Sequence, residues 1–295
     1  MSQTEKKRIL VTGATGFVGK HLCEHLEGCG HTVVRIGRSG TPSIDLAREN
    51  IPNDLLKDVD VVVHLAASKA GSTVDPKGEQ TKDIAARVAV SVNRSEVKRL
   101  IHLSSIAARL AEENDRSKRP YGVQKLAAEH ALADGLNNCQ IVTLRPPVIY
   151  GEGATGPFGT LLKFVQRGLP LPLANASEPR TYLSIVNLCA LLSQMVEAGD
   201  PVWKKADGLI FEPNDGRKVG TRDLAEMLGK SMEIETRVFW LPQSIIRSLG
   251  LITGKGDQVA AVFGPLQCRE EPSLEEYFGW EPSEQMPESL KVFGL

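Results

Sequence analysis

The sequence predicts an α/β protein built on a doubly wound parallel sheet, with a smaller lobe in its C-terminal half. Short aliphatic and β-branched runs alternate with stretches of helical periodicity, the pattern of a parallel sheet covered by helices on both faces. A glycine-rich loop separates the first such run from the first helical stretch. Proline and glycine cluster after Gly151, where the alternation stops. Together these observations predict a Rossmann fold followed by a lobe of loops and short helices.

Six apolar runs predict the strands, and helical stretches separate them. Runs of this length bounded by turn residues are typical of buried parallel strands. The first helix is expected directly after the glycine loop, and the segment from Ile185 to Val196 has the same helical character. The predicted strands are Ile9 to Val11, Thr32 to Ile36, Val59 to Leu65, Leu100 to Leu103, Ile141 to Leu144 and Leu209 to Glu212.

The glycine-rich loop TGATGFVG begins at Thr12 and joins a strand to a helix. Gly13 permits the tight turn, Gly16 lets the backbone approach a pyrophosphate, and Gly19 lets the helix lie close to the sheet. The helix N-terminus adds free N–H groups and positive potential. The spacing is GxxGxxG, which departs from the usual GxGxxG. Strand, loop and helix in this order predict a dinucleotide-binding site.

The chain is predicted to divide into two parts. Residues 1–150 form the dinucleotide-binding domain, to which a segment at about 182–213 returns. Residues 151–181 and 214–295 form the smaller, substrate-binding lobe. Thr221 is the expected N-cap of a helix in that lobe. The apolar stretch from Ile245 to Ile252 is short and is expected to be a packed helix.

Composition and charge exclude several classes of protein. The 295 residues carry a formal net charge of −1, with acidic and basic residues scattered, so neither a nucleic-acid surface nor a membrane surface is expected. Five cysteines show no CxxC or metal-ligand spacing, which argues against a disulfide framework and a metal site. No signal sequence or membrane span is evident, and a cytoplasmic protein is the expectation.

Tyr121 and Lys125 stand four residues apart in a run of helical composition. Tyrosine ionises at about pH 10 in water, so a tyrosine that exchanges protons needs a neighbouring cation that favours its phenolate. Positions four apart share one face of a helix, which places Lys125 to meet that need. The alternative is a surface tyrosine and a solvated lysine on an ordinary amphipathic helix. Combined with the glycine loop, the pair favours a redox enzyme.

Further motifs accompany the loop and this pair: Asp45-Leu46, the strand from Asp60 to Ala67, Ser104-Ser105, and the run LRPPVIYG from Leu144 to Gly151. With these motifs the chain resembles the extended short-chain dehydrogenase/reductase family over nearly its whole length. Within that family it is similar to the branch of nucleotide-sugar epimerases, dehydratases and 4-ketoreductases. The resemblance implies an NAD(P)-dependent enzyme.

The resemblance implies a catalytic set of Ser105, Tyr121 and Lys125. In such a set the tyrosine exchanges a proton with the substrate oxygen while hydride moves at the attached carbon, and the lysine hydrogen-bonds the nicotinamide ribose. The register favours Ser105 as the serine that polarises the oxygen and puts Ser104 nearer the nicotinamide, but both serines stay candidates. The implied cofactor-binding residues are Gly13, Thr15, Gly16, Phe17, Val18, Gly19, Arg38, Ser39, Asp45, Leu46, Leu65, Ala66, Ala67, Ser104, Tyr121, Lys125, Pro146 and Val148.

The choice between NAD and NADP is made at the end of the second predicted strand. An acidic residue there would hold the ribose hydroxyls of NAD, but this sequence has Gly37 at that position. Arg38 and Ser39 follow, and a guanidinium suits a 2′-phosphate. NADP(H) is therefore the favoured cofactor and NAD(H) is possible, with Arg38 as a merely solvated loop cation in the alternative interpretation.

The substrate is expected to be a nucleotide sugar. Arg180 matches the position at which the branch keeps an arginine for the diphosphate, and its fork of donors suits phosphate oxygens. Phe158 and Leu171 are candidates for a uridine or sugar pocket, although apolar residues at such spacing are more often core. Ser105 completes the implied substrate-binding set, and the resemblance also implies a homodimer.

Three functions compete. The first is a 4-ketoreductase, in which hydride reaches a C4 ketone of a UDP-hexose, and the second is a UDP-sugar 4-epimerase that uses the same residues and retains its cofactor. Val148 stands where many epimerases have an asparagine, and no carboxylate selects NAD, so the sequence favours the reductase. The third is a non-catalytic NADP(H)-binding sensor or scaffold, against which the intact Ser105, Tyr121 and Lys125 set argues.

Overall fold

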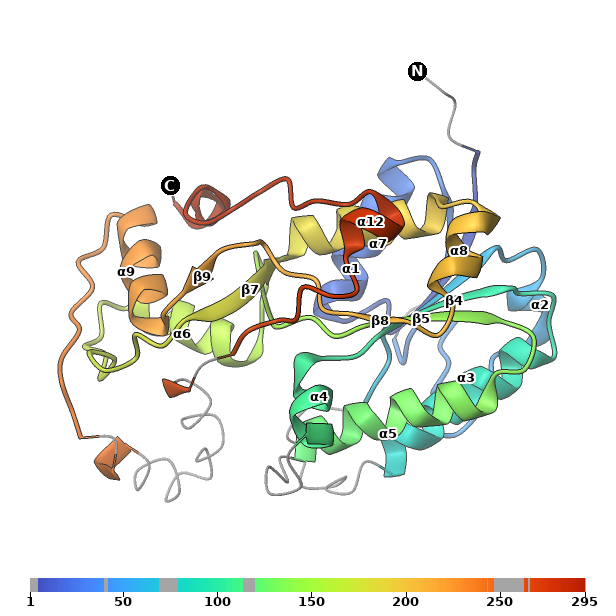
Figure 1. Ribbon diagram of the computed structural model, residues 1–295, viewed down its shortest axis with the longest axis horizontal. Coiled ribbons are helices and arrows are strands. Elements are labelled where there is room, and N and C mark those ends of the chain that lie inside the picture. Colours follow the sequence, from blue (N-terminus) through green and yellow to red (C-terminus); the bar gives the residue numbers. More distant parts are fainter. Residues whose placement is uncertain are drawn as a thin grey trace. The chain divides into compact units, whose positions relative to one another are not determined.

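The computed structural model describes residues 5–39, 42–68, 79–113, 120–242, 244–246, 263–264 and 266–294. The chain divides into two compact units (Figure 1). Unit 1 comprises Met1–Pro146, Leu188–Pro213 and Arg269–Glu281, and unit 2 comprises Pro147–Asn187, Asn214–Cys268 and Pro282–Leu295. Each unit is built from three segments that are far apart in sequence, so later parts of the chain return to complete each core.

Unit 1 contains a six-stranded parallel sheet, which confirms the predicted fold class. The strand order is β2-β1-β3-β4-β5-β8, so the order reverses beside β1 and opens a switch point at the carboxyl ends of β1 and β3. β3 is shorter than the sequence suggested because only its valine run and one histidine pair with β1 and β4. The strands are β1 (Arg8–Thr12), β2 (Thr32–Ile36), β3 (Val61–His64), β4 (Arg99–Leu103), β5 (Gln140–Leu144) and β8 (Ile210–Phe211).

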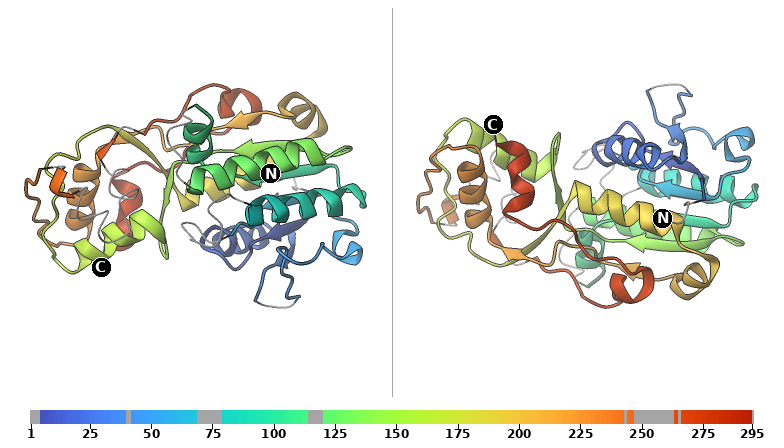
Figure 2. Two further views of the ribbon diagram at one scale, coloured as in Figure 1. Left: turned by 90° about the horizontal axis from the view of Figure 1, so that it is seen from below. Right: turned by 90° about the horizontal axis from the view of Figure 1, so that it is seen from above.

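Helices cover both faces of this sheet (Figure 2). One face carries α3 (Glu79–Asn93) and α5 (Pro120–Gly135), and the other carries α1 (Phe17–Gly28) and α7 (Ile185–Glu197). Leu10, Val62 and Leu100 lie on one face of the sheet and pack with residues of α3 and α5 in one buried cluster, while their apolar neighbours along the strands are buried on the other face. Shorter helices complete the unit: α2 (Asn53–Leu56), α4 (Ile106–Glu113), α8 (Asp200–Ala206) and α12 (Leu274–Phe278).

Unit 2 contains a small mixed sheet that the sequence did not predict. β6 (Val148–Tyr150) pairs parallel with β7 (Arg180–Ser184), which pairs antiparallel with β9 (Lys218–Val219). Strands of three and two residues are too short to show a periodicity of two. Helices α6 (Gly156–Gln166) and α9 (Thr221–Ser231) and a 3₁₀ helix at Glu288–Phe293 enclose its apolar core.

The structure differs from the sequence-based expectations at one helix cap and at one boundary between the two units. The prediction that Thr221 is an N-cap is wrong: Gly220 is the cap, and the Arg222 N–H donates to the Ala176 carbonyl at 3.0 Å, so neighbouring backbone takes the role of a hydroxyl. Residues 269–281, expected in the smaller lobe, group with unit 1, where the Gln194 amide donates to the Phe278 carbonyl at 2.7 Å.

The apolar stretch from Ile245 to Ile252 lies mostly outside the described residues. Within the described part of the chain, no helix is both long enough and apolar enough to cross a membrane.

Helix α1 provides a test of close packing at the glycine loop. A Cβ at Gly19 would lie 2.7 Å from the Ala14 Cα, whereas a Cβ at Gly28, in the same helix, would meet nothing within 4 Å. We expect Gly19→Ala to lose about 1–3 kcal/mol of unfolding free energy in urea, since the overlap forces backbone to move. Gly28→Ala is expected to be neutral or slightly stabilising because alanine favours helix. Equal stabilities for the two variants would contradict the packing argument.

Candidate active site

The glycine loop forms an open cradle at the N-terminus of α1. Gly13 has a φ of +71°, and a Cβ there would lie 2.9 Å from the Ala66 nitrogen, so only glycine fits. Gly16 is the N-cap of α1, and no side chain caps the helix. The first amides of α1 are therefore free of intrahelical acceptors and of side-chain caps. No acidic residue stands in the first turn, so the positive end of the helix is left for an anion.

One wall of this cradle is fixed by a buried threonine. The Thr12 hydroxyl is 2.8 Å from His64 Nδ1 and accepts the N–H groups of Leu65 and Ala66 at 3.2 and 3.3 Å. These bonds hold the half-buried backbone from Leu65 to Ala67 at the carboxyl end of β3. The sequence placed these three residues at the cofactor wall but did not identify Thr12 as their support.

The end of β2 faces the glycine loop. A Cβ at Gly37 would lie 3.1 Å from both the Cγ2 and the Oγ1 of Thr15, so a larger residue there would require the threonine side chain to shift. Arg38 and Ser39 are exposed. Beyond them, Asp45 accepts the Ala47 N–H at 3.2 Å in a turn, while Leu46 is buried in the core of the sheet.

The hydroxyl of Tyr121 lies close enough to Ser105 for the serine to lower the pKa of the phenol. Ser105 directly precedes α4, and Tyr121 is the second residue of α5, so the packing of these two helices brings the hydroxyls together. Tyr121 as a whole residue is 36% exposed, yet burial around its hydroxyl raises the pKa of the phenol, and Ser105 lowers it in part. At neutral pH the group is therefore a protonated phenol beside Ser105.

Lys125 lies one turn after Tyr121 and is 7% exposed. Its Nζ donates to the Leu103 carbonyl at 2.9 Å, which anchors the amine to the end of β4. Burial lowers the pKa of Lys125 to about 8, and the nearby carboxylate of Glu129 acts in the opposite direction. The amine is consequently poised close to physiological pH, as expected of a functional lysine.

Ser104 and Ser105 point to different partners. The Ser104 hydroxyl donates to Glu129, whereas Ser105 meets Tyr121. Glu129 also holds Arg145 through an Nη2–Oε2 contact of 2.5 Å and two bonds from Nε at 3.0 and 3.2 Å. The sequence analysis missed this buried pair. The regular spacing of Tyr121, Lys125 and Glu129 was the available sign.

Two stacked histidines lie beneath Lys125. His64 and His102 are register neighbours on β3 and β4, with ring centroids 5.3 Å apart. Burial, reinforced by the charge of Lys125, lowers the pKa of His64 to about 3, and burial lowers that of His102 well below its ordinary range. Within the described residues, His64 Nε2 and both ring nitrogens of His102 meet no partner at hydrogen-bonding geometry. Both rings are neutral, so they add no second positive charge beside Lys125.

The other residues singled out from the sequence have these positions. The Pro146 carbonyl accepts the Ile106 N–H at 2.9 Å, and Pro146 ends the first segment of unit 1. Val148 is half-buried in β6. In unit 2, Arg180 is 6% exposed and donates to the Gly264 carbonyl. Phe158 and Leu171 are buried in the core of that unit.

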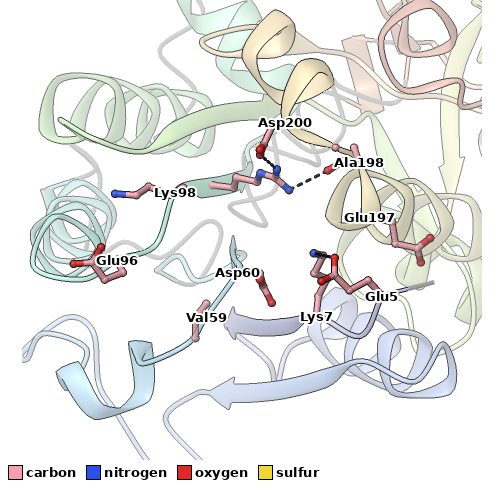
Figure 3. A pocket seen from close by; sticks show the side chains of 11 residues that line it. Glu5, Lys7, Val59, Asp60, Glu96, Lys98, Glu197, Ala198 and Asp200 are labelled. Atoms are coloured by element: carbon pink, nitrogen blue, oxygen red, sulfur yellow. Dashed lines mark hydrogen bonds and ion pairs between the residues drawn. The ribbon is translucent and has the colours of Figure 1, made fainter. Parts of the chain in front are cut away.

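A cavity of about 490 Å³ lies at the opposite edge of the parallel sheet (Figure 3). Its lining residues Lys7, Asp60 and Lys98 directly precede β1, β3 and β4, whereas the glycine loop and the serines follow carboxyl ends. Its charges already satisfy one another in part, since Arg99 is bound to Asp200 and to the Ala198 carbonyl. We therefore place the chemistry at the carboxyl edge, where ligands of such sheets bind.

Comparison with known proteins agrees with this geometry. Residues 9–206 match the model of the NAD dependent epimerase/dehydratase family. The chain belongs to this family. It is an NAD(P)-dependent enzyme of the short-chain dehydrogenase/reductase type, in the branch of nucleotide-sugar epimerases and reductases.

Three curated relatives in this family are similar to the chain. A UDP-glucose 4-epimerase of Vibrio cholerae is 28% identical over 97% of this chain and 94% of the relative. A ceramide reductase of Caulobacter vibrioides is 28% identical over 89% of this chain and 83% of the relative. A UDP-2-acetamido-2,6-beta-L-arabino-hexul-4-ose reductase of Pseudomonas aeruginosa is 29% identical over 75% of this chain and 56% of the relative.

Solved structures share the fold of this family member. A UDP-N-acetylglucosamine 4-epimerase from Bacillus cereus superposes with a TM-score of 0.73 at 19% identity, covering 98% of each chain. A human epimerase family protein solved with NADPH gives a TM-score of 0.74 at 20% identity, covering 97% of this chain and 98% of that one. At these identities the likeness establishes the fold alone.

The buried amine of Lys125 should lower stability at neutral pH. Its pKa falls from 10.5 to about 8 on folding, so the unfolded chain holds more protons between those values and stability rises with pH across that window. Below about pH 8 the full penalty, about 3 kcal/mol, is present. Because Lys125→Met also loses the bond to the Leu103 carbonyl, worth about 1 kcal/mol, we expect it to be about 2 kcal/mol more stable at pH 7.

Urea unfolding at pH 7, 9 and 10 measures this effect. The advantage of Lys125→Met should shrink toward pH 10, whereas Lys20→Met, at an exposed position of α1, should match the wild-type chain at every pH. A Lys125→Met protein that is less stable than wild type at pH 7 would contradict the argument.

Proposed function

We propose that the protein is an NADP(H)-dependent nucleotide-sugar oxidoreductase that transfers hydride at C4 of a UDP-hexose, working as a 4-ketoreductase. The observation that carries this proposal is the proximity of the Tyr121 hydroxyl to Ser105, one helical turn from the buried amine of Lys125. A phenol, a hydroxyl and an ammonium at one strand edge are the groups that a carbonyl reduction needs.

The residues at the glycine loop fit a dinucleotide. The uncapped N-terminus of α1 and the three close-packed glycines leave backbone N–H groups for a pyrophosphate. The loop and the first turn of α1 would hold the phosphates, Leu65 to Ala67 the nearer wall, and Asp45 and Leu46 the adenine. A nicotinamide cofactor supplies the hydride of such a reaction. Lys125 would hold its ribose, and Pro146 and Ser104 lie in segments that the resemblance puts near its carboxamide end.

The chain's own groups divide the remaining work. Ser105 would hold the ketone oxygen, and Tyr121 would donate its phenolic proton to that oxygen. The phenolate left behind is stabilised by the Lys125 ammonium, because an opposite charge nearby favours the ionised form. Burial keeps the pKa of Tyr121 raised, so the group is protonated at neutral pH. A proton donor that is ready before the reaction supports the reductive direction.

The substrate class rests on the relatives and on one arginine. Two of the relatives are named for UDP-sugars and one for ceramide. We propose that Arg180, buried in unit 2, serves a nucleotide diphosphate, for which its guanidinium is suited. Phe158 and Leu171 pack in the core of unit 2 and do not add support to the proposal. A substrate screen should therefore include 4-keto UDP-hexoses, UDP-hexoses and a long-chain ketone.

The second candidate is a UDP-sugar 4-epimerase. It is favoured by the Vibrio cholerae relative, whose match extends over nearly the full length of both chains. In that reaction the same tyrosine first removes a proton and later returns it, and the cofactor is recycled. A homodimer and a cytoplasmic location remain our predictions for either enzyme.

Tyr121→Phe tests the catalytic assignment. The variant keeps the ring but loses the proton donor, so we expect the rate of hydride transfer to fall by about a thousandfold or more while cofactor binding is retained. The matched control is Tyr277→Phe on α12, which should leave activity unchanged. If Tyr121→Phe retains its activity and still binds cofactor, the tyrosine is not the acid, and the sensor interpretation gains support.

NADPH stoichiometry, followed by absorbance, distinguishes the two reactions. A ketoreductase oxidises one NADPH for each sugar reduced, so the cofactor signal should fall in proportion to product. Many turnovers with a constant cofactor signal and a UDP-hexose that changes configuration at C4 would establish the epimerase instead.

Cofactor selection is tested at Arg38. We propose that its guanidinium binds the 2′-phosphate, and a charge-assisted bond of this kind is worth roughly 1.5–3 kcal/mol. Arg38→Ala should therefore raise the Kd for NADPH by about tenfold or more and leave that for NADH nearly unchanged, as measured by calorimetry. Arg48→Ala, at an exposed position of the neighbouring turn, is the control. Tighter binding of NADH than of NADPH by the wild-type protein would overturn the assignment.

A further inference from the structure

The carboxylate of Glu129 lies at the centre of the buried polar groups behind the Tyr121 and Lys125 pair. It follows Lys125 by four residues on α5, so both side chains project from one face of the helix. The residue is 6% exposed and its side chain 7%. Ser104, at the end of β4, and Arg145, at the end of β5, both donate to it. One buried acid thus joins the helix that carries the amine to two adjacent strand ends.

Arg145 fixes where this acid points. Its guanidinium binds both carboxylate oxygens of Glu129 in a fork and sends its remaining arm to Glu112 on α4, at 2.9 Å. A bidentate pair constrains direction as well as distance. The Ser104 hydroxyl donates a hydrogen bond to one of the same carboxylate oxygens, and Ser105 is the next residue in the chain. The carboxylate therefore constrains the backbone that presents the hydroxyl beside Tyr121.

The surroundings of Lys125 explain why a counter-charge is needed. His64 and His102 face the amine from β3 and β4, and both rings are uncharged. Tyr121, one turn earlier on α5, is a neutral phenol, and the Leu103 carbonyl carries only a partial charge. Arg145, which follows β5, donates to Glu129 and also to Glu112 of α4. Among the described groups around the amine, Glu129 is the one full negative charge that acts on it.

We propose that Glu129 is a positioning residue that keeps Lys125 in its ammonium form and holds Ser104, and through it Ser105, at the strand edge. This inference rests on the proposed function, because Lys125 and Ser105 are its targets. Glu129 itself does not contact the reacting atoms. Its role is to preserve the charge that stabilises the Tyr121 phenolate after proton transfer.

The direct test is the titration of the Lys125 amine in the full chain. Protein labelled with ¹³Cε-lysine is titrated by NMR, and the signal of Lys125 is assigned by its absence in Lys125→Met. The wild-type midpoint is expected at about 8. In Glu129→Gln it should fall by about one pH unit or more, because a nearby opposite charge has been removed. A folded Glu129→Gln protein with an unchanged midpoint would overturn the proposal.

Two further variants separate charge from packing. Glu129→Asp keeps the charge and should restore the midpoint to within about half a pH unit of wild type. Glu112→Gln removes the other partner of Arg145 at a half-exposed position and should leave the midpoint where it was. If Glu129→Gln does not fold because Arg145 is left unpaired, Glu129→Gln/Arg145→Gln replaces the ion pair by two amides. Because the double variant also removes the Arg145 cation, which disfavours a second ammonium nearby, its midpoint is compared with that of Arg145→Gln. A midpoint below that of Arg145→Gln is expected, and equal midpoints overturn the proposal.

Activity gives a second readout that simple loss of structure would not move. The alkaline limb of kcat/KM should shift to lower pH in Glu129→Gln by about as much as the NMR midpoint, and return in Glu129→Asp. If the midpoint shifts while Tyr121→Phe keeps full activity, Glu129 controls the amine and the proposed function fails. If Tyr121→Phe is inactive and neither the midpoint nor the limb moves in Glu129→Gln, the proposed function stands and this inference fails.

Discussion

The structure of the site depends on the burial of one amine. Lys125 reaches back from α5 to the Leu103 carbonyl, and this bond ties the helix to the end of the central strand β4. Removing an ammonium from water is unfavourable unless hydrogen bonds and charges replace the water. The groups around Lys125 meet that requirement in part. The Leu103 carbonyl accepts a hydrogen bond from the amine, the Glu129 carboxylate favours its charged form, and the two nearby imidazoles are neutral.

The same requirement explains how one edge of the sheet can serve acid–base chemistry. A lysine in water is a cation over most of the pH range and has little influence on a neighbouring phenol through solvent. Inside the protein its charge acts at low effective dielectric, where it favours the phenolate strongly. The fold accepts a local loss of stability at Lys125 because fully buried aliphatic residues of the parallel sheet, such as Leu10 and Leu100, stabilise the surrounding structure.

Local patterns were predictable from the sequence, and long-range partners were not. The loop from Thr12 to Gly19 spans eight consecutive residues, and Tyr121 and Lys125 are one helical turn apart, so the geometry of each follows from the local chain. The choice between Ser104 and Ser105 depends on which hydroxyl meets Tyr121, and only the packing of α4 against α5 decides that. Glu129 and Arg145 are sixteen residues apart and meet because β5 lies beside α5. No periodicity records such a pair.

The sheet of unit 2 was also not predictable from local sequence patterns. Its sheet is held by strands as short as the two residues Lys218–Val219, whose pairing depends on β7 rather than on their own composition. Likewise, glycine at position 37 can be read from the sequence, but its neighbour there is distant in sequence: a Cβ at Gly37 would meet the Thr15 side chain of the glycine loop at 3.1 Å. A larger side chain at that position would require this threonine to shift. The end of β2 and the glycine loop are therefore coupled through one side chain, which no local pattern in the sequence records.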